Sequence, residues 1–70
     1  MKLHKIEVRQ HGAGSWWWVG FSRNGRSLAS SDKYQRRGTA VKYMEAVTDA
    51  KRRRIPVVAV NNQDVETRLY

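Results

Sequence analysis

Residues 16–30 read WWWVGFSRNGRSLAS, and this stretch decides the fold. Its first part, Trp16–Phe21, consists of aromatic and other residues that favour a β-strand. An Asn-Gly pair follows at Asn24-Gly25, and such pairs tolerate the positive φ angles of a tight hairpin turn. The chain then returns as a weaker strand over Ser27–Ser30. The stretch therefore predicts a hairpin that carries tryptophan on both faces, because consecutive strand residues point in opposite directions.

The turn also predicts which side chains share a face. If it is a two-residue loop, Phe21 pairs with Leu28 and Val19 pairs with Ser30. One predicted face then holds Trp17, Val19, Phe21 and Leu28, and the other holds Trp16, Trp18, Gly20 and Ala29. A bulge at the turn would shift this register. In either case one face packs on a helix and the other needs a partner.

Elements on both sides extend the hairpin into a small sheet with one helix. Polar and apolar residues alternate over Leu3–Gln10, as in a half-buried strand. A helical period is present over Thr39–Lys51. Its apolar stripe comprises Ala40, Tyr43, Met44, Val47 and Ala50. A proline then disfavours helical geometry, and residues 55–60 are interpreted as a fourth strand. Residues 61–70 contain a turn and a tail that the pattern does not place, and we expect them to be flexible.

Length and composition limit the chain to one small basic domain. Its 70 residues contain 14 Lys and Arg against 6 Asp and Glu, a formal net charge of +8. Such a charge favours polyanionic partners such as DNA or RNA. There is no cysteine, so neither a disulfide nor a thiolate zinc site stabilises the fold. We expect an α+β domain, β-β-β-α-β, with a three-stranded antiparallel meander, one amphipathic helix and then a fourth strand.

The run from Trp16 to Val47 resembles one repeat of the YegP-like family of small bacterial proteins, a domain of unknown function. The resemblance rests on Trp16, Trp18, Asn24-Gly25, Leu28–Asp32, Tyr34, Ala40, Met44 and Val47. The chain departs from the family pattern at Gly20, Arg36 and Tyr43. Many members carry two tandem repeats that form one compact unit, so the resemblance implies that a single repeat forms a two-fold homodimer. Three tryptophans on so small a sheet favour the same state, because one short helix covers too little apolar surface.

The consecutive tryptophans Trp16, Trp17 and Trp18 are the first candidate binding surface. We favour a dimer interface for the face that the helix leaves open, because aromatic residues are enriched at protein interfaces. Stacking on the bases of single-stranded nucleic acid is an alternative, with cations on the neighbouring strand close by. An ordinary core arrangement is a third interpretation.

Clusters of cations form the second candidate surface. Lys51-Arg52-Arg53-Arg54 ends the predicted helix, where positive charge complements the helix dipole. Four consecutive cations exceed what helix termination requires, so phosphate contact is an equally good interpretation. The predicted nucleic-acid-binding residues are Arg23, Arg26, Arg36, Arg37, Lys51, Arg52, Arg53 and Arg54.

Catalytic and metal-binding patterns are not visible in the sequence. His4 and His11 are too far apart on an extended strand to share a metal ion. No serine has the strand-to-helix elbow of a nucleophile, and the acidic residues are scattered singly. We therefore expect a protein that is not an enzyme and that uses neither a cofactor nor a metal.

These observations favour a homodimeric binding module that associates with DNA or RNA through Arg and Lys. The alternative is a protein–protein interaction module that uses the tryptophan face and has no role with nucleic acid. Membrane binding is not expected, because the helix mixes charges of both signs on its outer face. The charged first strand differs from a signal peptide, so we expect a cytoplasmic protein. Small size and high arginine content would also suit a phage-encoded accessory protein.

Overall fold

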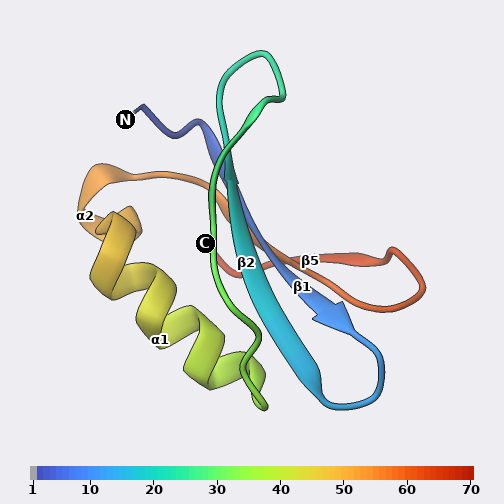
Figure 1. The fold of residues 1–70 in the computed structure, drawn as a ribbon. Helices are drawn as coiled ribbons and strands as arrows, with labels where there is room; N and C mark the ends of the chain where they lie inside the picture. The colour runs from blue at the N-terminus through green and yellow to red at the C-terminus, as the bar shows by residue number, and fades with distance from the viewer. Residues whose placement is uncertain (1) are drawn as a thin grey trace.

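The computed structural model describes residues 2–70 and shows a five-stranded mixed sheet with the order β3-β2-β1-β4-β5. The strands are β1 (Lys5–His11), β2 (Ser15–Phe21), β3 (Ser27–Ser30), β4 (Val57–Val60) and β5 (Glu66–Arg68). β1 and β4 are parallel, and the other neighbouring pairs are antiparallel. Helix α1 (Arg37–Thr48) and the short helix α2 (Ala50–Arg53) connect β3 to β4 on one side of the sheet (Figure 1). The predicted α+β class is confirmed, with one strand and one helix more than expected.

The β2–β3 hairpin has a bulge that the Asn-Gly pair alone does not predict. Val19 pairs with Ser30 as expected, but Phe21 pairs with Ser27 and not with Leu28. The reason is a wider turn, in which the Ser22 amide donates to the Arg26 carbonyl at 2.8 Å. Leu28 is therefore an extra residue on β3, while the two faces of β2 remain as predicted.

The core lies between α1 and the face of the sheet formed by the even-numbered residues of β1 and β2. Ile6, Val8 and Trp18 project from these strands and are almost completely buried together with Met44 of α1 and Val57 of β4. Gly20 lies on the same face against Leu3, whose Cδ2 would be 2.6 Å from a Cβ at this position. A larger side chain at position 20 would therefore displace Leu3.

The buried side of the helix differs from the predicted apolar stripe. Ala40 and Met44 are buried as expected, but Tyr43 is 49% exposed and Val47 is 66% exposed. The core takes Thr48 instead, four residues after Met44, and its hydroxyl donates to the Met44 carbonyl at 2.7 Å. Its polar group is thus satisfied inside the helix.

The predicted single helix is also interrupted. Asp49 adopts a left-handed φ of 55°, which ends α1 at Thr48 and starts α2 in a new direction. This break lets Ala50 still reach the core. The expected helix over Thr39–Lys51 is therefore two helices, of which the first begins earlier, at Arg37.

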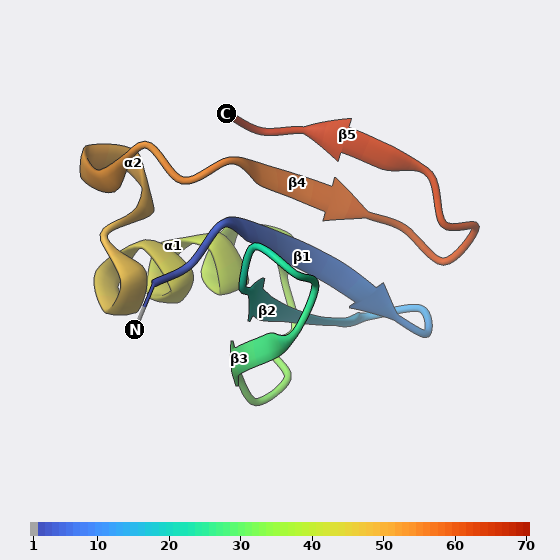
Figure 2. The same ribbon diagram turned by 90° about the horizontal axis from the view of Figure 1, so that it is seen from above.

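Residues 61–70 form a hairpin with β4 where a flexible tail was expected. The Asn61 side chain accepts hydrogen bonds from the amides of Gln63 and Val65, which shapes the turn. β5 then runs back along β4, as Figure 2 shows. The chain ends on the core, because the Val57 amide donates to the Tyr70 carbonyl at 3.0 Å. Within residues 2–70, no helix is long and apolar enough to span a bilayer.

Candidate nucleic-acid interface

The three tryptophans occupy different environments. Trp18 is 3% exposed and belongs to the core, so it does not contribute to an interface and its predicted role there is wrong. Trp16 is half-buried and packs against the same core, where its amide donates to the Tyr34 carbonyl at 2.7 Å. Trp17 points to the opposite face, because side chains alternate along β2. Of the three, Trp17 alone lies on the face away from α1.

The face away from α1, which we call the open face, has an aromatic half and a charged half. Trp17, Val19 and Phe21 of β2 form its aromatic strip. Val19 is 3% exposed in the middle of the strip, and the aromatic residues at its two ends are half-buried.

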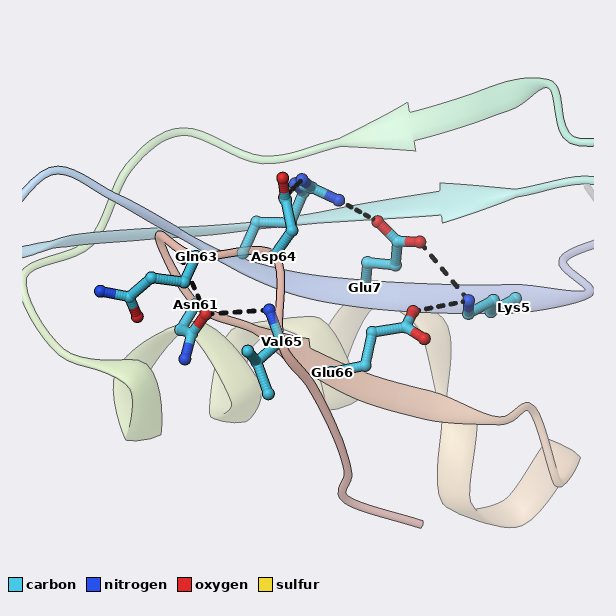
Figure 3. A network of polar contacts seen from close by, with 8 residues as sticks. Lys5, Glu7, Asn61, Gln63, Asp64, Val65 and Glu66 are labelled. Atoms are coloured by element: carbon cyan, nitrogen blue, oxygen red, sulfur yellow. Dashed lines mark hydrogen bonds and ion pairs between the residues drawn. The ribbon is translucent and has the colours of Figure 1, made fainter.

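The charged half of the open face is a network of ion pairs between β1 and the β4–β5 hairpin (Figure 3). Lys5 Nζ lies 3.0 Å from Glu66 Oε1 and 3.5 Å from Glu7 Oε2. Arg9 contacts Glu7 from the other side and reaches Asp64 Oδ1 at 3.2 Å. The hydrogen bond to Glu66 is the main cause of a raised pKa of Lys5. The charges of this half are thus largely compensated within the chain.

Eight of the 14 lysines and arginines belong to segments that meet at one end of the sheet. This basic end comprises Lys2, Arg23, Arg26, Lys51, Arg52, Arg53, Arg54 and Arg68. β1 and β4 begin at this end, and β2 and β5 finish there. The β2–β3 turn, the α2–β4 connection and the residues before β1 therefore lie at the same end of the molecule (Figures 1 and 2).

Two open grooves bring the cations of the basic end together in groups. Lys51, Arg54 and Arg68 line a groove of about 350 Å³ beside Tyr70. Lys2 and Arg23 line a second groove of about 770 Å³, next to the β2–β3 turn. Residues far apart in the sequence thus share two positively charged concave surfaces.

Within residues 2–70, five of the six Asp and Glu side chains form ion pairs. Glu7, Glu66 and Asp64 belong to the charged half of the open face. Among the residues of the basic end, Lys51 lies 3.9 Å from Glu45 and Arg52 pairs with Asp49.

Five cations of the basic end have no ion-pair partner within the part of the chain that the structure describes. They are Lys2, Arg23, Arg26, Arg54 and Arg68. Their charge is not neutralised by a neighbouring carboxylate and is available to an anionic ligand.

Two of the predicted phosphate-binding residues lie elsewhere. Arg36 and Arg37 are at the start of α1, a helix of 12 residues and therefore about 18 Å from the cations that follow it. Arg36 occupies the N-cap position without a side-chain capping bond. The predicted set is thus divided between two ends of the molecule.

Sequence analysis missed Lys2 and Arg68 as members of the basic end. Arg68 was missed because the tail was not placed in the sheet, although its alternation with Glu66 is compatible with an edge strand. Tyr70 was missed as well: its hydroxyl donates to Glu45 Oε2 at 2.7 Å, and Lys51 Nζ lies 5.4 Å from its ring centroid. Burial and the bond to Glu45 raise the pKa of Tyr70. The hydrogen bond to Glu45 holds the chain end beside Lys51.

Comparison of the chain with protein-family models, with curated proteins and with solved structures finds no significant match. The resemblance to a YegP-like repeat therefore stays a prediction. Within residues 2–70, no group of three or more His, Cys, Asp or Glu side chains is placed to hold a metal ion. The basic end and the aromatic strip of the open face are thus the features that indicate a function.

Proposed function

We propose that this protein is a non-enzymatic nucleic-acid-binding module whose basic end contacts phosphate groups. The observation that carries the proposal is the collection of eight cations from four separate chain segments at one end of the sheet. If the cations served only solubility, an even distribution over the surface would be sufficient. Phosphate contacts of this kind supply most of the affinity in sequence-independent binding.

The basic end is rich in arginine, the cationic side chain that is best suited to binding phosphate. Six of its eight cations are arginines, whose planar guanidinium matches phosphate oxygens in a bidentate arrangement. Arg54 also adopts a left-handed φ of 57°, a conformation for which glycine is the favoured residue. The chain thus carries a charged side chain at a position where helix termination alone would favour glycine.

Salt dependence tests the proposal. We expect the wild-type protein to bind a fluorescein-labelled oligonucleotide, with an affinity that falls by about a hundredfold or more between roughly 50 and 200 mM salt. Fluorescence anisotropy at several salt concentrations measures this slope, and an uncharged fluorescein conjugate is the control. Absence of binding at the lowest salt concentration would refute the proposed function.

We also propose that the protein forms a two-fold homodimer, through a flank of α1 and not through the predicted tryptophan face. Tyr43 stacks on Tyr34 with ring centroids 5.3 Å apart, and Tyr34 bridges to β2 on the side of β3. Tyr43 and Val47, one helical turn apart, are both exposed on this flank of α1. A second copy would cover this apolar flank and leave the basic end free.

Size-exclusion chromatography with light scattering tests the dimer. We expect a mass of twice 8.2 kDa for the wild type and of a monomer for Val47→Glu, because a buried carboxylate disfavours association. Lys42→Gln, an exposed position elsewhere on the same helix with the same change of one charge unit, is the matched control and should remain dimeric. A wild-type protein that stays monomeric at all concentrations would contradict this proposal.

A further inference from the structure

Two aromatic side chains of the open face, Trp17 and Phe21, lie in open grooves at opposite ends of the aromatic strip. The groove at Trp17 has a volume of about 480 Å³ and is also lined by Lys33. The groove at Phe21 has a volume of about 320 Å³ and is also lined by Arg23. Each aromatic ring thus borders an accessible hollow that also contains a cation.

The strip between the two grooves is apolar and closely packed. Val19 lies midway and is 3% exposed, so it forms a floor between the two rings. Trp17 and Phe21 are four residues apart on one strand, a separation of about 13 Å. A flexible ligand with several flat groups could therefore contact both rings along one straight path.

The carboxylates near the strip leave the two grooves open to an anion. Glu7 is directly opposite Val19, but Lys5 and Arg9 flank it and neutralise its charge. Asp32 lines the groove at Trp17 next to Lys33, so this groove holds one charge of each sign. Glu7 also lines the groove at Phe21, where the two cations Lys5 and Arg23 outnumber this one carboxylate.

The aromatic strip is continuous with the basic end. Arg23 lines both the groove at Phe21 and the groove that contains Lys2. A polyanion held by the basic end therefore has a direct path onto the open face. A second copy of this chain is a poorer occupant, because it would bring a net charge of +8 against the same cations.

We propose that the open face binds single-stranded nucleic acid by stacking unpaired bases on Trp17 and Phe21, with phosphates held by Arg23 and Lys33. This inference rests on the proposed function and narrows its ligand to single strands. The π-faces of bases within a duplex are already covered by their neighbours, whereas those of a single strand are free to stack on aromatic side chains. Stacking tolerates every base, so we expect little sequence preference.

Anisotropy with an oligothymidylate of about 12 nucleotides tests the proposal, a length within the range of about 4–16 nucleotides that single OB folds cover. We expect Trp17→Ala to weaken binding by about tenfold and Trp17→Phe to restore most of the loss, because a phenyl ring still stacks. Phe21→Ala should have an effect in the same direction. Val65→Ala, a truncation of an exposed apolar side chain that lines neither groove, is the control and should bind as the wild type does.

The competing outcomes separate this inference from the proposed function. If the wild type binds with the expected salt dependence but Trp17→Ala and Phe21→Ala bind equally well, base stacking is wrong and phosphate contact stands. Tighter binding to a duplex of the same length than to the single strand would also overturn the inference. If the wild type binds neither form, both proposals fail. Circular dichroism of each variant shows that it is folded before its affinity is compared.

Discussion

Replacing Trp18 by alanine is expected to reduce the free energy of unfolding by about 3–5 kcal/mol. Trp18 is 3% exposed and packs in the core with Ile6 and Met44. A domain of 70 residues has about 4–10 kcal/mol of stability in total, so this single change removes much of it. Urea denaturation followed by circular dichroism measures the loss.

The neighbouring residue provides a matched control. Trp17→Ala removes the same side chain from the opposite face of the same strand, where the ring is only half-buried. We expect a smaller cost, about 1 kcal/mol, because part of this surface is already in contact with water. Equal losses for Trp17→Ala and Trp18→Ala would contradict the assignment of the two faces.

A conservative variant keeps this experiment informative if Trp18→Ala fails to fold. The indole Nε1 of Trp18 is buried and has no hydrogen-bond partner among the described residues. Trp18→Phe removes this unsatisfied N–H while it keeps most of the buried apolar surface. We therefore expect Trp18→Phe to cost much less than Trp18→Ala.

Neutralising the basic end is expected to lower nucleic-acid affinity by roughly 10- to 100-fold at low salt. Each lost arginine–phosphate contact is expected to cost up to about 1 kcal/mol of binding free energy. The variant combines Arg23→Gln, Arg26→Gln and Arg54→Gln, three cations without an ion-pair partner in the described part of the chain. The slope of log affinity against log salt should also become shallower by about two to three. Anisotropy titrations at several salt concentrations give both quantities.

A second triple variant has the same net charge as the first but changes cations elsewhere in the molecule. It shows whether affinity depends on the position of the cations or only on the net charge. It combines Arg36→Gln, Arg37→Gln and Lys42→Gln, which lie on α1 away from the basic end. We expect this variant to lose affinity only slightly, through the weaker overall field. If both triple variants lose affinity equally, binding depends on net charge, and the basic end is not a specific contact surface.

The sequence contains enough information to predict that Trp17 lies on the opposite face of the sheet from Trp16 and Trp18, but not which of the two faces is the core. Alternation along a strand has a period of two, so the assignment of Trp17 and Trp18 to opposite faces does not depend on the turn. The register at Phe21 does depend on the turn, and the sequence left it open between a two-residue loop and a bulge. The structure has the bulge, because Ser22 and Arg26 form a wider loop than Asn-Gly requires.

The buried side of the helix could not be predicted from the apolar pattern alone. A helical wheel treats Thr48 as polar and Val47 as apolar, yet Thr48 satisfies its hydroxyl within the helix and fits the core. The left-handed turn at Asp49 then redirects the chain, which no periodic pattern encodes.

The position of Arg68 depends on tertiary structure in the same way. It belongs to the basic end because β5 pairs with β4, a contact that short-range patterns in residues 61–70 do not predict. The clusters of cations were therefore visible in the sequence, but their convergence at one end of the sheet was not.

The central claim is that the basic end and the open face bind nucleic acid together. Its most direct test is a titration of the ¹⁵N-labelled protein with oligothymidylate, followed by two-dimensional NMR. We expect shifts at the indole N–H of Trp17 and at the amides of Phe21, Arg23 and Arg54, with little change at Tyr43 and Val47. Shifts confined to the exposed side of α1, or no shifts at low salt, would contradict it.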